Sequence, residues 1–258
     1  MFAHVNLETR PGETLAIVGP SGCGKSTLLL TLAGLHEASS GFVLLEGRPL
    51  ARPDARIGLV LQQYGLFPWL TVLRNATLGM EIRSRRQDVR PARPPDDAAR
   101  DMLGRLGLGG RVNDYPRRLS GGEQQRLALC RTLLLDPDVL LLDEPFSALD
   151  ALTREELQDL LLEVLADRKV AAVLVTHSID EAVYLGDRLG ILAAARDAGR
   201  TTAGLVETRA AAGPAVEAPA RLTLEPNPGG ARGLDRTDSA YHEACSWMRH
   251  RFSKVARA

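Results

Sequence analysis

The sequence predicts an α/β fold built around a mainly parallel sheet, with a helical subdomain inserted into the sheet domain. Short apolar runs rich in Val, Ile and Leu alternate with longer helical patterns, as in parallel strands joined by crossover helices. Several of these runs lack alternating polar residues, as expected for strands covered on both faces. The expected strands are residues 14–18, 42–46, 57–61, 139–142, 170–176 and 189–193. The expected helices are residues 25–35, 98–106, 120–135, 152–165, 179–185 and 239–252.

The chain of 258 residues is long enough for one large domain or two modest ones. The strand pattern disappears between residues 66 and 136, which predicts the helical subdomain inside a sheet domain of residues 1–193. Residues 83–97 hold five arginines and three prolines. We expect a solvated turn there because proline interrupts a regular helix face, the alternative being a phosphate-contacting patch. Composition predicts irregular structure over residues 194–238, and the final helix completes a C-terminal extension of residues 194–258 by packing back on the body.

Charge and cysteine content exclude several classes of protein. The 32 basic side chains balance the 32 acidic ones, so no overall charge draws the protein to nucleic acid or to an anionic membrane. The three cysteines form no CxxC pair, which argues against a disulfide framework or a zinc site and favours a reducing compartment. No apolar run approaches the roughly 20 residues of a membrane span, and the first residues do not resemble a secretion signal.

The strongest motif lies between the first expected strand and the first expected helix. It fits the pattern GxxxxGK[ST] and consists of Gly19, Pro20, Ser21, Gly22, Cys23, Gly24, Lys25, Ser26 and Thr27. Glycines allow successive backbone N–H groups to surround a phosphate, and the following helix offers its positive end to the same anion. Lys25 is expected to reach the β- and γ-phosphates, and the Ser26 hydroxyl to bind Mg²⁺. The motif therefore predicts a P-loop NTPase core.

Two acidic residues follow the buried strand of residues 139–142. They lie at the carboxyl end of a central strand, where open α/β sheets bind ligands. We expect Asp143 to contact the Mg²⁺ shell. Glu144, which faces another way because side chains alternate along a strand, is expected to polarise an attacking water. The alternative is a pair of solvated acids at a strand end.

A third motif opens the helix of residues 120–135. Ser120 and Glu123 have the spacing of a capping box, which is a sufficient structural explanation for both. It does not explain Gly121 and Gly122, because each glycine in a first turn reduces helix stability by up to ~1 kcal/mol relative to alanine. Close approach of an anion to the backbone would explain them.

Residues 119–126, LSGGEQQR, resemble the signature of the ATP-binding cassette (ABC) ATPases, and the resemblance extends over residues 12–193. It implies ATP and Mg²⁺ as ligands, and ATP hydrolysis as the activity. It further implies a dimer, expected to be of identical copies, in which Ser120, Gly121 and Gly122 of one cassette close over the nucleotide held by the P-loop of the other.

The remaining motifs of that family match this sequence in order. Gln62 matches the Q-loop glutamine, which implies contact with Mg²⁺ and the γ-phosphate. Residues 147–150, Ser-Ala-Leu-Asp, match the D-loop, which implies communication between the two nucleotide sites. His177 matches the switch histidine, which implies contact with the γ-phosphate and with Glu144. As an isolated residue, His177 would more often be an ordinary strand-end histidine.

The segment from Gln62 to Leu73 resembles cassettes of bacterial importers for nitrate, taurine, alkanesulfonates and related small anions, as do residues 176–185 and the last helix. The resemblance implies a cassette bound to the cytoplasmic face of the membrane through a transmembrane permease, with an external substrate-binding protein as an indirect partner and no nucleic acid. Leu66, Phe67, Trp69 and Leu70 are expected to line a groove for a permease helix or to pack in the core.

Two features depart from the family pattern or add to it. Gly19 lies only 18 residues from Met1, and Phe2 is too near the P-loop to match the aromatic residue that stacks on adenine in this family. We therefore expect either an upstream start or a missing stacking contact worth about 1–3 kcal/mol, and so weak ATP binding. Cys23 lies near a positive helix end, which predicts a lowered thiol pKa, loss of ATPase activity on alkylation and protection by Mg-ATP; the alternative is an inert small residue.

Three other functions are consistent with some of these motifs. A soluble ABC-type ATPase acting on DNA or ribosomes shares them, but such relatives generally carry long coiled coils or two cassettes in one chain. A P-loop kinase or GTPase would share the P-loop, but its function would not require the LSGGEQQR motif. A start-truncated inactive cassette would show no Mg-ATP turnover.

Overall fold

Five parallel strands form the centre of the sheet, in the order β8, β2, β7, β6, β5. They are β2 (Thr14–Val18), β5 (Ile57–Val60), β6 (Val139–Asp143), β7 (Ala171–Thr176) and β8 (Arg188–Asp197). This computed structural model describes residues 2–3, 5–87, 93–197, 200–205, 225–226, 233 and 235–255. Val18 is in register with Thr176, and Asp143 with Val175. The carboxyl ends of the three central strands therefore meet at one edge.

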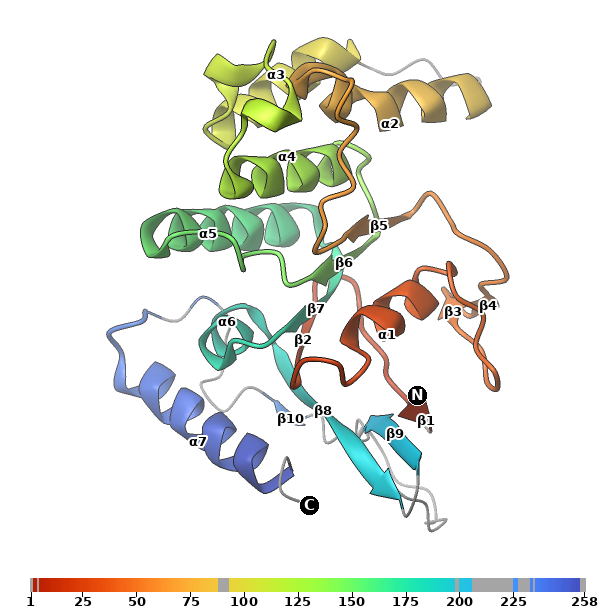
Figure 1. Cartoon of the computed structure of the whole chain (residues 1–258), viewed down its shortest axis with the longest axis vertical. Coiled ribbons are helices and arrows are strands. Elements are labelled where there is room, and N and C mark those ends of the chain that lie inside the picture. The colour runs from red at the N-terminus through yellow and green to blue at the C-terminus, as the bar shows by residue number, and fades with distance from the viewer. Residues whose placement is uncertain are drawn as a thin grey trace.

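The two faces of the sheet are covered by different helices, which confirms the predicted α/β class (Figure 1). Leu15 and Ile17 of β2 pack in a cluster with Leu28 and Leu29 of α1 (Lys25–Leu32). Their neighbours in the strand, Ala16 and Val18, belong to a larger cluster on the other face. That cluster includes side chains of α5 (Ala151–Arg168), α6 (Ile179–Leu185) and α7 (Ser239–Val255). Burial on both faces explains why the strand sequences lack polar alternation.

A helical layer lies between β5 and β6 in sequence, at the top of Figure 1. It comprises α2 (Val72–Gln87), α3 (Pro95–Arg105), η1 (Gly109–Arg111), η2 (Pro116–Arg118) and α4 (Gly121–Leu133). All regular elements among the described residues from 66 to 136 are helical, as predicted. No helix in the described part of the chain has both the length and the apolar composition needed to cross a bilayer.

The prediction of a turn over residues 83–97 is wrong at both ends of this range, where the chain is helical. Residues 83–87 continue α2, and Pro95 begins α3 with Pro94 as its N-cap. Proline is tolerated in the first helical turn because the N–H that it lacks has no intrahelical partner there. Residues 88–92 lie outside the described residues.

The C-terminal extension is more regular than the composition predicts. Residues 194–197 continue β8, which pairs antiparallel with β9 (Arg200–Leu205), so the expected irregular structure is wrong there. β9 also pairs with β1 (Phe2–Ala3), and β8 with β10 (Glu225–Pro226). Residues 198–199, 206–224, 227–232 and 234 lie outside the described residues. A boundary at residue 193 therefore falls within a strand, and the division into two domains stays a prediction.

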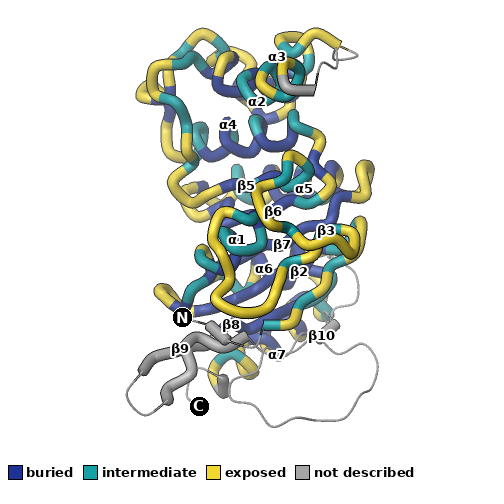
Figure 2. Tube along the Cα trace, turned by 90° about the vertical axis from the view of Figure 1, so that its right-hand side faces the viewer, coloured by how far each residue is buried: buried dark blue, intermediate teal, exposed yellow. Residues whose placement is uncertain are grey.

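Two further elements bear on the expected boundaries. The strand expected at residues 42–46 is shorter, because only β3 (Leu44–Leu45) forms, paired with β4 (Arg48–Pro49) in a separate hairpin. The final helix α7 packs against α6, as expected, and its residues range from buried to exposed (Figure 2). The buried ones include Tyr241, Cys245 and Met248.

The packing of α5 on the sheet yields a test of the fold. Leu161 and Leu152 lie on this helix with 1% and 68% of their surface exposed. Leu161→Ala should lower the free energy of unfolding by about 2–5 kcal/mol, because it removes buried methyl groups and leaves a cavity. Leu152→Ala, the same change on the exposed face, should alter it by less than about 0.5 kcal/mol. Urea denaturation measures both values, and equal effects would show that this face of α5 is not in the core.

Candidate active site

The P-loop connects β2 to α1 at the carboxyl edge of the sheet, as the sequence predicts. Gly22 and Gly24 have φ values of 80° and 101°, a left-handed backbone that favours glycine. At Gly19 the reason is space, because a Cβ there would lie 2.6 Å from the Leu192 carbonyl oxygen and 2.7 Å from Cys23 Sγ. The two kinds of constraint fix a tight loop immediately before the positive end of α1.

Lys25, the first residue of α1, points back into this loop. Its side chain is 6% exposed. The ammonium donates hydrogen bonds to the carbonyl oxygens of Gly19 at 2.8 Å and Pro20 at 3.1 Å. Lys25 Nζ also lies 3.5 Å from Glu144 Oε1. The P-loop cation and the acid that follows β6 therefore form one cluster.

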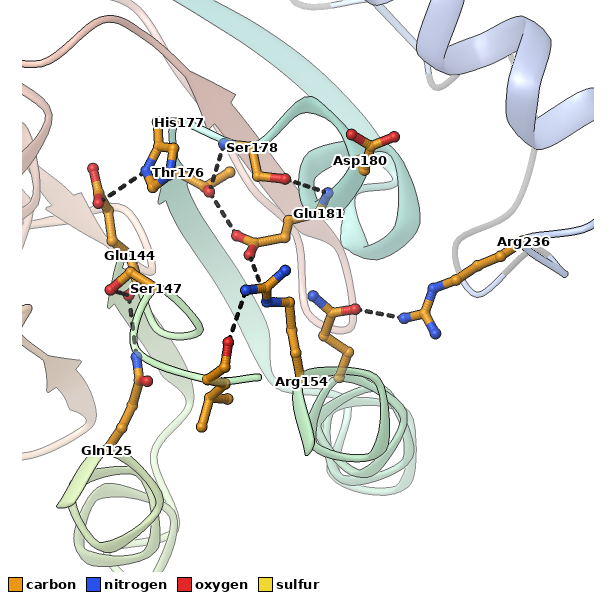
Figure 3. A network of polar contacts seen from close by, with 12 residues as sticks. Gln125, Glu144, Ser147, Arg154, Thr176, His177, Ser178, Asp180, Glu181 and Arg236 are labelled. Atoms are coloured by element: carbon orange, nitrogen blue, oxygen red, sulfur yellow. Dashed lines mark hydrogen bonds and ion pairs between the residues drawn. The ribbon is translucent and has the colours of Figure 1, made fainter. Parts of the chain in front are cut away.

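Glu144 is held by its backbone in an unusual conformation. Its φ of 48° lies in the left-handed region, where a residue with a side chain is strained by roughly 1–2 kcal/mol. Its N–H donates to the Val175 carbonyl at 2.9 Å. Its own carbonyl accepts from Gln125 Nε2 at 3.2 Å and from Ser147 Oγ at 3.1 Å (Figure 3). The direction of the Glu144 side chain is thus set by this turn, and the expected alternation along the strand is not its cause.

The Glu144 carboxylate joins three elements of the fold. One oxygen faces Lys25 as described, and the other lies 3.0 Å from Nδ1 of His177, directly after β7 (Figure 3). The Glu144 side chain is 13% exposed, whereas that of His177 is 59% exposed. A largely buried carboxylate therefore stands between a buried cation and an accessible imidazole.

Asp143 and Ser26 form a second pair of oxygen ligands beside this cluster. The Asp143 carboxylate is buried and accepts a hydrogen bond from the Ser26 hydroxyl. Burial raises the pKa of Asp143, and the Glu144 charge acts in the same direction against the lowering effects of Ser26 and Lys25. A carboxylate and a hydroxyl are donors that suit a hard cation such as Mg²⁺. A bound cation would also relieve the cost of keeping this carboxylate charged.

Among the described residues, Gln62 and the first residues of the third motif, Ser120 to Gly122, make no hydrogen bond or ion pair with this cluster. Gln62 is exposed just after β5, and within the described residues no hydrogen bond or ion pair joins it to Ser26 or Asp143. The expected capping box is present at α4, where Ser120 Oγ accepts from the Glu123 N–H at 3.3 Å and Glu123 Oε2 from the Ser120 N–H at 2.8 Å.

The two glycines of that motif differ in their surroundings. A Cβ at Gly122 would lie 2.8 Å from Cδ2 of Leu149, so packing against the D-loop accounts in part for this glycine. A Cβ at Gly121 would meet only ordinary contacts, the nearest being Ala148 Cβ at 3.6 Å. Gly121 and Ser120 are exposed. The start of α4 therefore packs against the chain's own D-loop, and for Gly121 a structural explanation is still missing.

No role was predicted for Gln125 from the sequence, although it lies within LSGGEQQR. This side chain is 1% exposed, and it links α4 to the Glu144 carbonyl. Its Oε1 is buried and accepts no hydrogen bond from the part of the chain that the structure describes. A buried polar residue in a helix does not follow the apolar periodicity, so only its position within the LSGGEQQR signature could have suggested a role.

The expected activation of Cys23 is wrong. The residue is 3% exposed, and burial raises its thiol pKa although the nearby Lys25 charge and two backbone N–H groups act in the opposite direction. Desolvation disfavours the thiolate more than the helix terminus favours it. Cys23 therefore acts as a small packing residue under the loop.

A glycine-rich strand-to-helix loop, a buried strand ending in two acids and a helix that opens with Ser-Gly-Gly together define a P-loop ATPase cassette. The comparisons agree. The family model described as ABC transporter matches residues 2–147, and the chain belongs to this family as an ABC ATPase.

Several relatives are similar over most of the chain. The aliphatic sulfonates import ATP-binding protein SsuB of Bacillus subtilis is 46% identical over 194 residues, which cover 75% of this chain and 73% of that protein. An uncharacterized ABC transporter ATP-binding protein of Methanocaldococcus jannaschii, MJ0412, is 47% identical over 191 residues, covering 74% and 70%. Among solved structures, a dimeric post-hydrolysis state of the ATP-binding cassette MJ0796 bound to ADP and Pi aligns with a TM-score of 0.67 and 33% identity, covering 74% of this chain and 85% of that one.

Thiol labelling tests the burial of Cys23. The other two cysteines, Cys130 and Cys245, are also buried, with pKa values raised to about 12 and about 11. Because little thiolate forms at pH 7.5, iodoacetamide should label the folded protein far more slowly than it labels free cysteine, and mass spectrometry should find three labels only after unfolding. Rapid single labelling at Cys23 in the folded protein would restore the activated-thiol hypothesis.

Proposed function

We propose that this chain hydrolyses Mg-ATP at the site around Glu144 and thereby energises an importer of small organic anions, with aliphatic sulfonates as the substrate class. The observation that carries the proposal is the convergence of Lys25, Glu144 and His177 at the carboxyl ends of β2, β6 and β7. The names of the similar proteins support the import role and the substrate class.

The P-loop residues would hold the phosphates of ATP. Backbone N–H groups from Gly19 to Thr27, Pro20 excepted, and the positive end of α1 would attract the anion. Lys25 would exchange its contacts with two carbonyls and Glu144 for the β- and γ-phosphates. Mg²⁺, held by Ser26 and Asp143 with Gln62 approaching it, would neutralise charge on those phosphates. The release of Glu144 from Lys25 is then a direct consequence of ATP binding.

Glu144 would orient and deprotonate the attacking water, and His177 would hold that carboxylate in place. The Glu144 carboxylate is close enough to His177 Nδ1 to form a hydrogen bond, at 3.0 Å. Backbone bonds on both sides of Glu144 restrict its movement. A preorganised base of this kind typically contributes about 10²–10⁴-fold to a rate.

Two identical copies would complete each nucleotide site. Ser120, Gly121 and Gly122 begin a capped helix whose first turn packs against the chain's own D-loop and is exposed at Ser120 and Gly121. The N–H groups of Gly121 and Gly122, together with Ser120, would then bind the phosphates held by a second copy. The dimeric state of the similar cassette MJ0796 supports this arrangement.

The loop from Tyr64 to Thr71 would bind the permease at the cytoplasmic face of the membrane. Trp69 is 70% exposed and stacks at a tilt on Phe67, with ring centroids 5.6 Å apart. The buried Asn75 side chain accepts from the Phe67 N–H and donates to the carbonyls of Phe67, Leu70 and Thr71. A rigid loop that displays an aromatic side chain suits recognition of an apolar helix. The substrate-binding protein would then act only through the permease, and the balanced charge favours this partner over DNA or ribosomes.

Glu144→Gln tests the catalytic proposal. It keeps the size of the side chain but removes the base, so kcat for Mg-ATP should fall by about 10²–10⁴-fold while nucleotide binding persists. Phosphate release and fluorescent nucleotide binding measure the two properties. Wild-type protein without turnover would favour the inactive-cassette alternative, and unchanged turnover in the variant would exclude Glu144 as the base.

Trp69→Ala tests the permease contact. Removing a central aromatic side chain should weaken binding to the permease by about 2 kcal/mol, roughly 30-fold, without changing basal ATP hydrolysis. Phe42→Ala is the matched control, because Phe42 is 77% exposed on the loop before β3. Binding to permease in nanodiscs gives the readout. Equal losses in both variants would place the contact elsewhere, and co-purification of nucleic acid or ribosomes would favour the alternative function.

A further inference from the structure

Two of the helices described in the structure, α4 and α6, begin with the spacing of a capping box, and of these two α4 alone forms the complete box. At α4 the Glu123 side chain returns to the Ser120 N–H. At α6 the Ser178 side chain accepts from the Glu181 N–H at 3.3 Å, which is half of the box. The Ser178 N–H donates instead to Thr176 Oγ1 at 3.0 Å. The Glu181 carboxylate is therefore free of the capping role that its position predicts.

The Glu181 carboxylate turns inward, toward the end of β7. The residue is 7% exposed, and Oε2 accepts a hydrogen bond from Thr176 Oγ1 at 2.6 Å. Thr176 and Ser178 flank His177, so the Thr176 hydroxyl closes the turn that carries the imidazole (Figure 3). Burial raises the pKa of Glu181, and the Glu144 charge adds to this effect, while Thr176, Arg154 and His177 lower it. A buried carboxylate in this position needs a cation.

That cation comes from the helix that follows the D-loop. Arg154 Nε lies 3.7 Å from Glu181 Oε1. Another nitrogen of the same guanidinium donates to the carbonyl of Leu149, within the D-loop, at 2.8 Å. Arg154 thus contacts the D-loop through Nη2 and Glu181 through Nε (Figure 3).

The contact between Arg154 and Glu181 has room to shorten. Arg154 Nε is buried and makes no hydrogen bond to any described residue, and 3.7 Å exceeds the usual 2.7–3.2 Å for such a bond. A shift of less than about 1 Å would turn the ion pair into a charge-assisted hydrogen bond, which is roughly twice as strong as a neutral one. A movement of the D-loop would therefore shift the turn that carries His177.

We propose that Glu181 and Arg154 are positioning residues that couple the D-loop to the His177 turn, so that the Glu144–His177 contact depends on where the D-loop lies. The inference rests on the proposed ATPase function. The chain of contacts runs from the Leu149 carbonyl through Arg154, Glu181 and Thr176 to the turn carrying His177. Neither Glu181 nor Arg154 is expected to touch ATP.

Three variants test the coupling: Glu181→Gln, Arg154→Gln and the double variant. Glutamine at 181 can still accept the Thr176 bond, and the backbone cap of α6 persists, so Tm should change little. Each single variant should lower kcat by about tenfold with KM for ATP within twofold, because misplacement of a catalytic group affects the reaction more than binding. The double variant should be no worse than the poorer single variant, since both changes break one link.

An NMR readout makes the test independent of turnover. The His177 Cε1–H signal of the nucleotide-free protein, assigned with a His177→Gln variant, should move in Arg154→Gln as well as in Glu181→Gln. Glu155→Gln is the matched control, because Glu155 is next to Arg154 on α5 and pairs with an arginine, Arg236, at 3.2 Å, but is 52% exposed. It should change neither the signal nor kcat.

The outcomes separate the inference from the proposed function. The first case is that wild-type protein hydrolyses ATP. If the effects of the two single variants on kcat then multiply in the double variant, or if the single variants do not change kcat, the coupling is wrong and the ATPase function stands. A His177 signal that stays in place in Arg154→Gln also overturns the coupling. If wild-type protein does not hydrolyse ATP, the function fails and the NMR result alone decides the inference.

Discussion

The left-handed turn at Glu144 determines the arrangement of the whole site. Strand β6 delivers Asp143 in register with β7, and the next residue leaves the strand with a φ of 48°. Strain of this kind persists only where surrounding bonds enforce it, here the bonds to Val175, Gln125 and Ser147. The result is a carboxylate shared by the P-loop lysine and the histidine after β7. A relaxed backbone at this residue would send the side chain elsewhere, and the other groups would lack a common partner.

The parallel sheet makes this convergence possible. Parallel strands end at the same edge, so loops distant in sequence are brought together without long connections. Burial of both faces, by α1 on one side and by α4 to α7 on the other, keeps the three central strands rigid. The same packing joins α5 and α6, on which Arg154 and Glu181 meet. The residues expected to respond to nucleotide are therefore supported by the packed core, whereas the contacts expected to change lie in loops.

The parts that were predictable from sequence have local causes. The P-loop and the capping box at α4 depend on neighbouring residues, and the parallel strands on unbroken apolar runs. The conformation of Glu144 and the burial of Gln125 depend on tertiary hydrogen bonds, which no local sequence pattern predicts. The raised pKa of Cys23 depends on burial under the loop, which outweighed the helix terminus that the sequence does reveal. A strand at residues 189–193 was predicted, but its continuation to Asp197 and its pairing with β9 were missed because the alanine and glycine residues there have weak strand propensity.

A crystal structure of the Glu144→Gln variant with Mg-ATP would test the central claim most directly. The account predicts Lys25 on the β- and γ-phosphates, Ser26 and Asp143 beside the metal, and residue 144 and His177 facing the γ-phosphate. It also predicts Ser120, Gly121 and Gly122 of a second copy closing the site. Nucleotide bound away from the P-loop, or Lys25 still hydrogen-bonded to the carbonyls of Gly19 and Pro20 beside a bound γ-phosphate, would contradict it.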